Sequence, residues 1–364
     1  MLGSHYFGDK AYTEYNNYII FKNSFPHLLA GKNLYVLYPE QQWDLYKYSP
    51  TFALSMGIFA YLPDYIGLSF WNILNAVVLL FSFRMLPFNK RTQSIMLWFV
   101  LLELLTSLQN AQSNGLMAGL MVAAYCCMQQ KKVFWATLWL VVATLIKVYG
   151  AIGFCLFLFY PDKIRFILYA AFWTILLVFL PMIVPSVTLH TLIWQYQNWG
   201  IMMAEDQSVS YGVSVMGWLH SWFGLESGKG VVTLVGIVLF LLPFLRRNMY
   251  KNEVYKILVL ASMLLWVIIF NHKAESPTYI IAVAGAILWY YCLPRKKWSY
   301  VFLVLLFLIT CMSPTDFYPK FIRDGFFKPY AIKAVPCIVL WCIITIELML
   351  IKPAQELANC NTHS

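Results

Sequence analysis

The chain has 364 residues, of which 61% are hydrophobic and only 12% are charged, and its mean hydropathy is +0.65. A soluble domain carries about 25% charged residues, so this composition excludes an ordinary soluble enzyme. The net charge of +10 would suggest a nucleic-acid partner in a soluble protein. In a membrane protein it reflects orientation, because cytoplasmic loops collect Lys and Arg. We therefore predict an all-α, polytopic membrane protein that forms one domain over residues 1–364 and has no nucleic-acid partner.

Residues 1–50 precede the first apolar run of spanning length, and we expect them to form an extracytoplasmic loop. Within this loop the stretch IIFKNSFPHLL is amphipathic, which predicts a helix lying on the membrane surface. The first residues, MLGSHYFGDKAY, contain no signal peptide. We hypothesise that the native chain has one more helix upstream of Met1. The run 51–63 is too short to span and is expected to be interfacial or re-entrant.

Eleven apolar runs follow, each near the ~20 residues that cross a bilayer. They predict a bundle of about eleven transmembrane helices between residues 66 and 351. Their expected bounds are 66–84, 94–109, 113–129, 133–147, 149–160, 165–185, 231–246, 255–270, 277–292, 299–312 and 335–351.

The breaks between these runs alternate in charge. One set of breaks holds 15 of the 26 Lys and Arg residues, and the positive-inside rule assigns that set to the cytoplasm. It comprises 84–93, 130–132, 161–165, 246–256, 293–298 and 352–364. The other breaks, with the long loops 185–230 and 313–334, would then share the extracytoplasmic face with residues 1–50. Long loops on a rigid scaffold commonly carry function, so we expect the active site to face outside.

An amide-rich stretch, TSLQNAQSNGL, connects two of the expected helices at residues 106–116. Amides both donate and accept hydrogen bonds, which suits a hydroxyl-rich ligand such as a sugar. The alternative is a turn with Asn-Gly chemistry and helix caps, and the two readings are about equally supported. The candidate sugar- or acceptor-binding residues are Gln109, Asn110, Gln112 and Asn114.

Ionisable residues near the outer ends of the helices are the next candidates. Glu103 lies inside an expected span, where a charge is costly and indicates function. Lys147 is a plausible partner for it, although a lysine at a helix end also snorkels outward.

Cations on the outer face suit a phosphate group, which needs positive charge or hydrogen-bond donors when it leaves. His272 and Lys273 lie in FNHKAESPTY, and Arg323 lies in SPTDFYPKFIRDGFFKPY. In the first stretch we expect Ser276 to be the N-cap and Pro277 the first residue of a helix, whose N-terminus would favour an anion. Glu275 would orient one of the cations or act as a further base. General attraction to membrane lipids with anionic headgroups is the alternative for these cations.

No metal or cofactor is predicted. The eight cysteines show no Cys-x-x-Cys pair or Cys/His ligand spacing, and we interpret them as small apolar filler. Nucleotide-binding loops and the HExxH and GxSxG motifs are also missing from the sequence.

Several short stretches in a consistent order resemble glycosyltransferase family 87 between about residues 14 and 340. They are EYNNY with Gly31 to Tyr35, YKYSPTFAL, the WNILN helix, QNAQSNG and LIKVYG. The resemblance implies a GT-C type bundle with its active site on the outer face. It also implies inverting transfer of a hexose, mostly mannose, from a polyprenyl-phosphate donor, without a nucleotide sugar or an obligatory metal.

The resemblance further implies an acidic base in the first external loop. The family usually has Asp-Phe-x-x-Tyr, so Glu14 of EYNNY is the first candidate, with Asp9 and Asp44 in reserve. Counting back from Gly31 instead reaches Asn17, whose amide is no base and would make the protein inactive or dependent on a neighbour. Lys147, His272, Lys273 and Arg323 would bind the donor phosphate, and Tyr48 would contact the sugar or acceptor.

We therefore expect a polyprenyl-phosphate-dependent hexosyltransferase, mannosyltransferase-like, that acts on an extracytoplasmic lipid or glycan and resides in a bacterial cytoplasmic membrane. A lipid-linked oligosaccharide transporter or polymerase would bind the same carrier but need no external base. A catalytically impaired family member is the third possibility.

Overall fold

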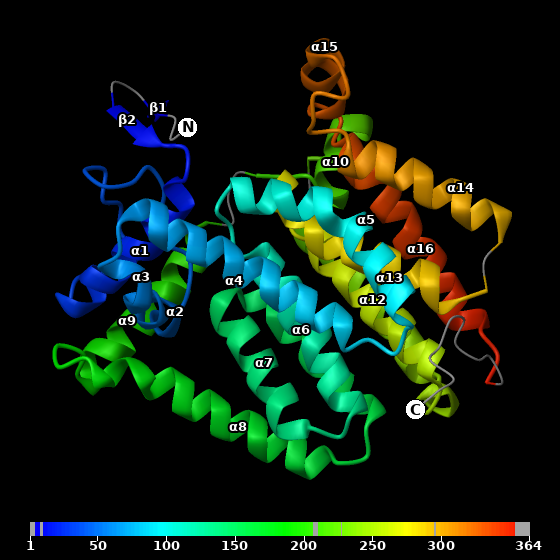
Figure 1. Cartoon of the computed structure of the whole chain (residues 1–364), viewed down its shortest axis with the longest axis horizontal. Coiled ribbons are helices and arrows are strands. Elements are labelled where there is room, and N and C mark those ends of the chain that lie inside the picture. The colour runs from blue at the N-terminus through cyan, green and yellow to red at the C-terminus, as the bar shows by residue number, and fades with distance from the viewer. Residues whose placement is uncertain (1–3, 8–9, 207–209, 227, 295, 354–364) are drawn as a thin grey trace. The chain divides into compact units, whose positions relative to one another are not determined.

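The structure is a computed structural model that describes residues 4–7, 10–206, 210–226, 228–294 and 296–353 (Figure 1). The regular secondary structure of these residues is helical apart from one antiparallel hairpin, in which β1 (Ser4–Phe7) pairs with β2 (Lys10–Thr13) in the register Ser4 to Thr13. The all-α prediction did not include this hairpin. Its two strands precede the first helix and pair only with each other, so the prediction of a helical fold class is confirmed.

The chain divides into two compact units. Unit 1 comprises Met1–Leu79, Ser107–Phe154 and Asp162–Val209, and unit 2 comprises Leu80–Thr106, Cys155–Pro161 and Ser210–Ser364. The chain passes from one unit to the other inside α4 (Asp64–Arg84) and again inside α5 (Lys90–Gln109).

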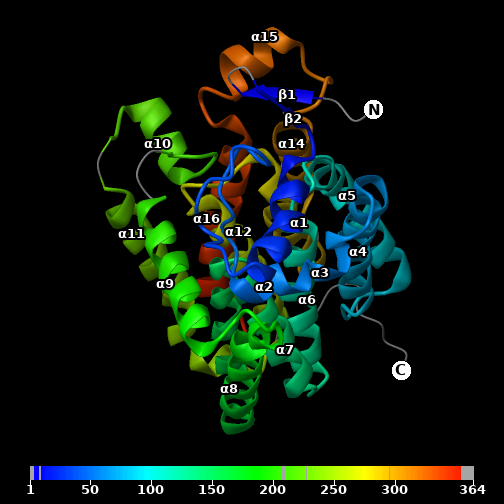
Figure 2. The same ribbon diagram turned by 90° about the vertical axis from the view of Figure 1, so that its left-hand side faces the viewer.

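Unit 1 is built around α6, whose residues up to Met128 are all buried. Gly119 lets this helix approach α4 closely, because a Cβ at this position would lie only 2.9 Å from the backbone of Val78 and Leu79. Helices α7 and α8 pack against each other, and Figure 2 shows them side by side. The helices of unit 1 outside α4 and α5 are α1 (Asn16–Leu29), α2 (Pro50–Ser55), α3 (Gly57–Ala60), α6 (Asn114–Gln129), α7 (Val133–Ile146), α8 (Lys163–Phe179), η2 (Leu180–Ile183) and α9 (Leu189–Glu205).

Unit 2 has the helix pair α12 (Glu253–Ile269) and α13 (Tyr279–Cys292) as its core, and every residue of α13 is buried. The two helices approach closely at Gly285, where a Cβ would lie 2.7 Å from the carbonyl oxygen of Ala261. The other helices that lie wholly within unit 2 are α10 (Val215–Phe223), α11 (Lys229–Leu241), η3 (Leu242–Leu245), η4 (Arg247–Met249), η5 (Ser276–Thr278), α14 (Lys297–Leu306), η6 (Phe307–Cys311), α15 (Lys320–Ile322), η7 (Arg323–Phe327), η8 (Ile332–Ala334) and α16 (Val335–Leu350).

Each of the eleven predicted apolar runs falls on a helix, so the helical part of the prediction is confirmed. Within the described residues, four helical stretches are long and apolar enough to cross a membrane, and shorter apolar helices accompany them. The chain is thus an integral, multi-pass membrane protein, while its orientation stays a prediction. The four long stretches are Asp64–Arg84, Lys90–Gln109, Lys163–Ile183 and Ile332–Leu350.

The run expected at 149–160 is a 3₁₀ helix, η1 (Val148–Phe159), rather than an α-helix. Two glycines lie where it turns back on α7: a Cβ on Gly150 would be 2.7 Å from Ala143, and one on Gly153 would be 2.4 Å from Leu140. A 3₁₀ helix rises about 2.0 Å per residue against about 1.5 Å for an α-helix. This short run therefore extends further than its length suggests.

Candidate active site

The first turn of α1 lies against the amide hairpin, the name used here for residues 106–116. Asn17 Nδ2 donates a hydrogen bond of 2.9 Å to the backbone carbonyl oxygen of Asn110. Glu14 is exposed in the turn that precedes α1. The start of α1 and the amide hairpin, which are distant in sequence, are thus brought together within unit 1.

The WNILN motif on α4 holds the amide hairpin in place. Trp71 Nε1 donates to the carbonyl oxygen of Ala111 at 3.0 Å, and Asn75 Oδ1 accepts from the backbone N–H of Leu116 at 2.9 Å. Ala111 has a φ of 51°, which is uncommon for a residue with a Cβ. These side chains therefore stabilise a turn that alanine does not favour on its own.

The inner half of the amide hairpin forms a hydrogen-bonded chain with a lysine. Lys147 Nζ donates to Asn114 Oδ1 at 2.7 Å, and Asn114 Nδ2 donates to Gln112 Oε1 at 2.6 Å. The Lys147 ammonium also lies 5.9 Å from the ring centroids of Tyr48 and Tyr149. We call this group the lysine–amide network.

The predicted sugar-binding amides divide into two pairs. Gln112 and Asn114 are buried and belong to the lysine–amide network, whereas Gln109 and Asn110 are exposed at the tip of the amide hairpin. Tyr48, another predicted contact, lies at the Lys147 side of the network. The structure thus groups Asn17, the four amides, Lys147 and Tyr48 in unit 1.

The predicted pairing of Glu103 with Lys147 is wrong. Glu103 on α5 forms an ion pair of 2.6 Å with Lys333, and the side chains are 0% and 7% exposed. Lys333 also donates to Ser276 Oγ at 2.9 Å and lies 5.2 Å from the Tyr279 ring. The two partners are 230 positions apart, so no local pattern in the sequence could have matched them.

The stretch FNHKAESPTY, which we call the 270s junction (residues 270–279), packs on the end of the 185–230 loop within unit 2. Val213 N–H donates to the carbonyl oxygen of Ala274 at 2.7 Å, and Tyr279 OH donates to that of Val213 at 2.8 Å. Gly212 has a φ of 57°, and a Cβ there would lie 2.5 Å from the carbonyl oxygen of His272. Glycine is therefore required at this contact.

The helix start in the 270s junction is shifted by one residue from the prediction. The N-cap is Glu275, and Ser276 is already the first residue of η5, so its hydroxyl is available to accept from Lys333 instead of capping. His272 and Lys273 are half-buried and Glu275 is exposed.

Arg323 has a carboxylate partner: its Nη1 lies 2.9 Å from Asp316 Oδ1. Nearby, Lys328 contacts Asp324 at 2.6 Å. This hydrogen bond lowers the pKa of the Asp324 carboxyl, with the charges of Lys328, Lys320 and Arg323 adding to the effect. The basic 313–334 loop is therefore partly neutralised by its own acids.

The reserve carboxylates are placed as follows. Asp9 lies outside the described residues. Asp44 is half-buried, accepts from the backbone N–H of Leu45 at 2.7 Å and lies 3.2 Å from Lys47. Lys47 also lies 3.6 Å from Asp206, so one lysine serves two carboxylates.

Sequence analysis did not single out the pair formed by Lys22 and Asp64. Their side chains lie 2.7 Å apart, and Tyr15 OH contacts Asp64 Oδ2 at 3.4 Å. Burial, followed by the charge of Asp64, raises the pKa of Tyr18 to about 12. These contacts of Lys22 and Tyr15 with Asp64 fasten α1 and the turn before it to the start of α4. An acid at the first position of α4 was the available signal.

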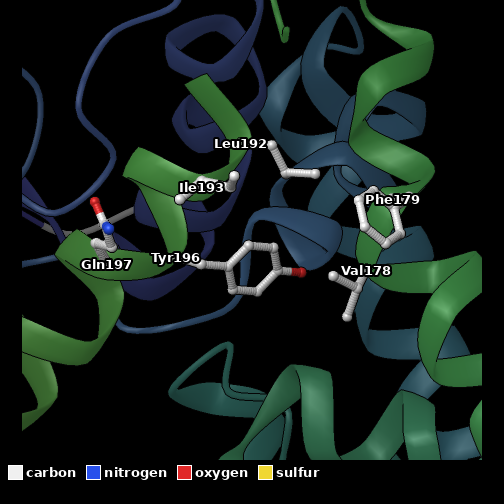
Figure 3. A pocket seen from close by; sticks show the side chains of 6 residues that line it. All are labelled: Val178, Phe179, Leu192, Ile193, Tyr196 and Gln197. Carbon is white, nitrogen blue, oxygen red and sulfur yellow. The ribbon is translucent and has the colours of Figure 1, made fainter. Parts of the chain in front are cut away.

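An apolar cavity of about 390 Å³ opens between the end of α8 and the first turns of α9, entirely within unit 1. In Figure 3, Tyr196 reaches across between the side chains of Leu192 and Val178. Its hydroxyl lies 3.1 Å from Thr51 Oγ1, which also donates to the carbonyl oxygen of Leu177 at 2.7 Å. Thr51 follows Tyr48 by three positions, so the segment 48–51 has Lys147 at one end and this cavity at the other.

Among the residues that the structure describes, no group of three or more His, Cys, Asp or Glu side chains could hold a metal ion.

The model of glycosyltransferase family 87 matches residues 46–314 of the chain. This span includes the amide hairpin, the WNILN motif, Lys147 and the 270s junction, but not Glu14, Asn17, Arg323 or Lys333. No curated protein sequence matches the chain significantly.

Proposed function

We propose that this chain, which belongs to glycosyltransferase family 87, transfers a hexose from a polyprenyl-phosphate donor to an extracytoplasmic lipid or glycan. Family membership establishes a glycosyltransferase with a sugar donor and an acceptor, and the long apolar helices establish a multi-pass membrane protein. Mannose as the sugar, the polyprenyl carrier, the outward orientation and a single GT-C type domain belong to the proposal.

The observation that carries the proposal is the arrangement around segment 48–51. A polyprenyl-phosphate sugar combines hydroxyl groups, a phosphate and a long apolar chain. Unit 1 supplies exposed amides at the tip of the amide hairpin, the Lys147 ammonium, and an apolar cavity beyond Thr51. These are the three chemistries that the donor combines.

Each polar group has a role in this scheme. The acceptor hydroxyl oxygen bonds to the anomeric carbon while the bond from that carbon to the phosphate oxygen breaks and its electron pair stays on the phosphate. Lys147 stabilises the developing phosphate charge. Gln112 and Asn114 hold Lys147 in position, and Gln109 and Asn110 contact the sugar or acceptor. His272, Lys273 and Arg323 belong to unit 2, and their phosphate-binding role stays a prediction from the sequence.

Glu14 is the proposed base that takes the proton of the acceptor hydroxyl. Its exposure in the turn before α1 leaves it accessible to an acceptor. Asn17, the alternative by register, holds no basic oxygen, and its amide is engaged with the amide hairpin.

The test incubates the purified full chain with polyprenyl-phosphate-mannose and extracted lipid or glycan acceptors and detects mannosylated product by mass spectrometry. Glu14→Gln should abolish turnover and keep donor binding, while Glu40→Gln, an exposed acid in the same loop, should change neither. Product formation unchanged in Glu14→Gln would remove Glu14 from the mechanism.

Donor binding without product by the wild-type chain, over every acceptor tried, would instead favour a transporter or an impaired transferase. Asn17 is the observation that favours the impaired form, because it occupies the position where the family's acid is expected by register.

A further inference from the structure

A second cavity, of about 320 Å³, lies in unit 2 where α13 and α16 end and α14 begins. Its volume is at the lower end of the ~300–1,000 Å³ typical of small-molecule sites. Its walls include Trp289, Trp298, Lys296 and Glu347. None of these residues takes part in the proposed transfer reaction.

One wall of this cavity is suited to a cation. Glu347 Oε2 accepts a hydrogen bond of 2.6 Å from Trp289 Nε1, which holds the carboxylate against the indole ring. The Trp289 and Trp298 rings lie 5.8 Å apart with an interplanar angle of 46°. A carboxylate beside aromatic faces attracts an ammonium through a charge-assisted hydrogen bond and cation–π contact.

A positively charged side chain, that of Lys296, lies at the mouth of the cavity. Lys296 is exposed and lies just before α14, in the basic break 293–298. An ammonium group is a point charge that binds phosphate oxygens. The cavity therefore offers a negative and a positive group to a single ligand.

The position of the cavity identifies the source of that ligand. It lies at the end of the apolar stretch Ile332–Leu350, which is long enough to span a bilayer, so its mouth is expected at the level of the lipid headgroups. Tryptophan is enriched at this level. A zwitterionic headgroup meets both charges of the cavity, whereas an anionic one meets only Lys296.

We propose that this cavity binds the headgroup of a phospholipid that carries a primary ammonium and a phosphate, such as phosphatidylethanolamine. The ammonium donates to Glu347 against the tryptophan faces, and the phosphate contacts Lys296. A primary ammonium has N–H donors for the carboxylate and a quaternary ammonium has none, so the site selects the former.

The test measures lipid binding to the purified full chain by native mass spectrometry, with phosphatidylethanolamine, phosphatidylcholine and phosphatidylglycerol offered in equal amounts. The wild-type chain should retain phosphatidylethanolamine in preference to both others. Glu347→Gln keeps an oxygen that accepts from Trp289 but removes the charge, and it should weaken phosphatidylethanolamine binding roughly tenfold. Lys296→Ala should weaken it as well.

Two variants serve as matched controls: Lys297→Ala changes the next lysine, which does not line the cavity, and Glu253→Gln changes an exposed acid of unit 2. Both should bind like the wild type. Retention of phosphatidylglycerol equal to that of phosphatidylethanolamine would overturn the proposal in favour of general attraction to basic residues. Equal retention of phosphatidylcholine, or an unchanged preference in Glu347→Gln, would overturn it too.

Discussion

Two lysines at the ends of apolar helices have different surroundings. Lys333 in unit 2 faces a carboxylate, Glu103, at 2.6 Å, and the pair is almost completely buried. Lys147 in unit 1 is half-buried and donates to Asn114, a neutral amide, at 2.7 Å, beside two tyrosine rings. An ion pair cancels the charge of its lysine, and an amide oxygen orients the ammonium without cancelling its charge.

The contrast separates a structural role for Lys333 from the binding role proposed for Lys147. A charge buried in an apolar interior requires its partner, so the Glu103–Lys333 pair holds α5 and the start of α16 together in unit 2. Lys333 also reaches Ser276 and so fastens the 270s junction. In unit 1, Asn114 accepts a hydrogen bond from Lys147 and donates one to Gln112, and these amides orient the ammonium as expected for the phosphate contact proposed for it.

The largest expected effect comes from breaking the buried pair. Lys333→Met leaves the Glu103 carboxylate buried without its counter-charge, and Glu103 Oε2 already has no hydrogen-bond partner within the described residues. We expect a loss of about 3–5 kcal/mol in the free energy of unfolding. Thermal unfolding of the purified chain in detergent measures it.

The control for this variant removes both charges. Glu103→Leu combined with Lys333→Met should recover most of the lost stability, because no uncompensated charge remains. A double variant as unstable as Lys333→Met alone would show that packing, and not charge, governs this position.

The next effect is on catalysis. Lys147→Met should reduce sugar transfer about 100-fold, as expected when a preorganised donor to a developing negative charge is lost. Stability should change little by comparison with Lys333→Met. Lys132→Met, an exposed lysine at the other end of α7, is the matched control and should transfer sugar normally. Equal losses of transfer in both variants would contradict the binding role of Lys147.

Helical architecture was predictable from the sequence because hydrophobic runs specify helices locally. The run 149–160 is also helical, although it is a 3₁₀ helix in which Gly150 and Gly153 pack closely against α7. The pairing of Glu103 was not predictable, since Lys147 and Lys333 both lie at ends of apolar runs and only tertiary packing selects between them. The β1–β2 hairpin was missed because residues 1–15 carry no apolar run from which to argue.

The part of the candidate site that could be predicted is the part for which the types of residue in a short stretch are enough to suggest a ligand. Amides near a lysine emerged from the TSLQNAQSNGL and LIKVYG stretches, and the structure joins them at Asn114. The Lys22–Asp64 pair was missed because its two members come from different elements. The apolar cavity beyond Thr51 was missed for the same reason, since α8 and α9 form it together.

A smaller effect tests how α1 is attached to the amide hairpin. Asn17→Ala removes the hydrogen bond to the Asn110 carbonyl oxygen and should cost about 1 kcal/mol of stability, read from thermal unfolding. Asn23→Ala, the same change on the same helix, controls for helix propensity.

Asn17→Asp sharpens the question of register. An aspartate cannot donate to the Asn110 carbonyl oxygen, so the contact seen here predicts lower stability and no gain in sugar transfer. A gain in transfer would identify position 17 as the base position and displace Glu14.

The smallest effect concerns the pH response of α1, the helix that brings Asn17 to the amide hairpin. His27 is 5% exposed, stacks on the Tyr38 ring at 3.8 Å, and has no hydrogen-bond partner for Nε2 within the described part of the chain. Burial lowers the pKa of His27 below its usual 6.5, with Lys32 adding to the effect and a hydrogen bond with Gln41 opposing it. The folded state therefore favours the neutral imidazole.

As the pH falls through the ordinary histidine pKa, the unfolded chain takes up the proton first, and stability decreases until the lowered pKa is passed. Between about pH 7.5 and about pH 5.5, the unfolding temperature should fall more for the wild type than for His27→Gln. His190→Gln, at an exposed histidine, should respond like the wild type, and an identical pH response in all three chains would contradict the prediction.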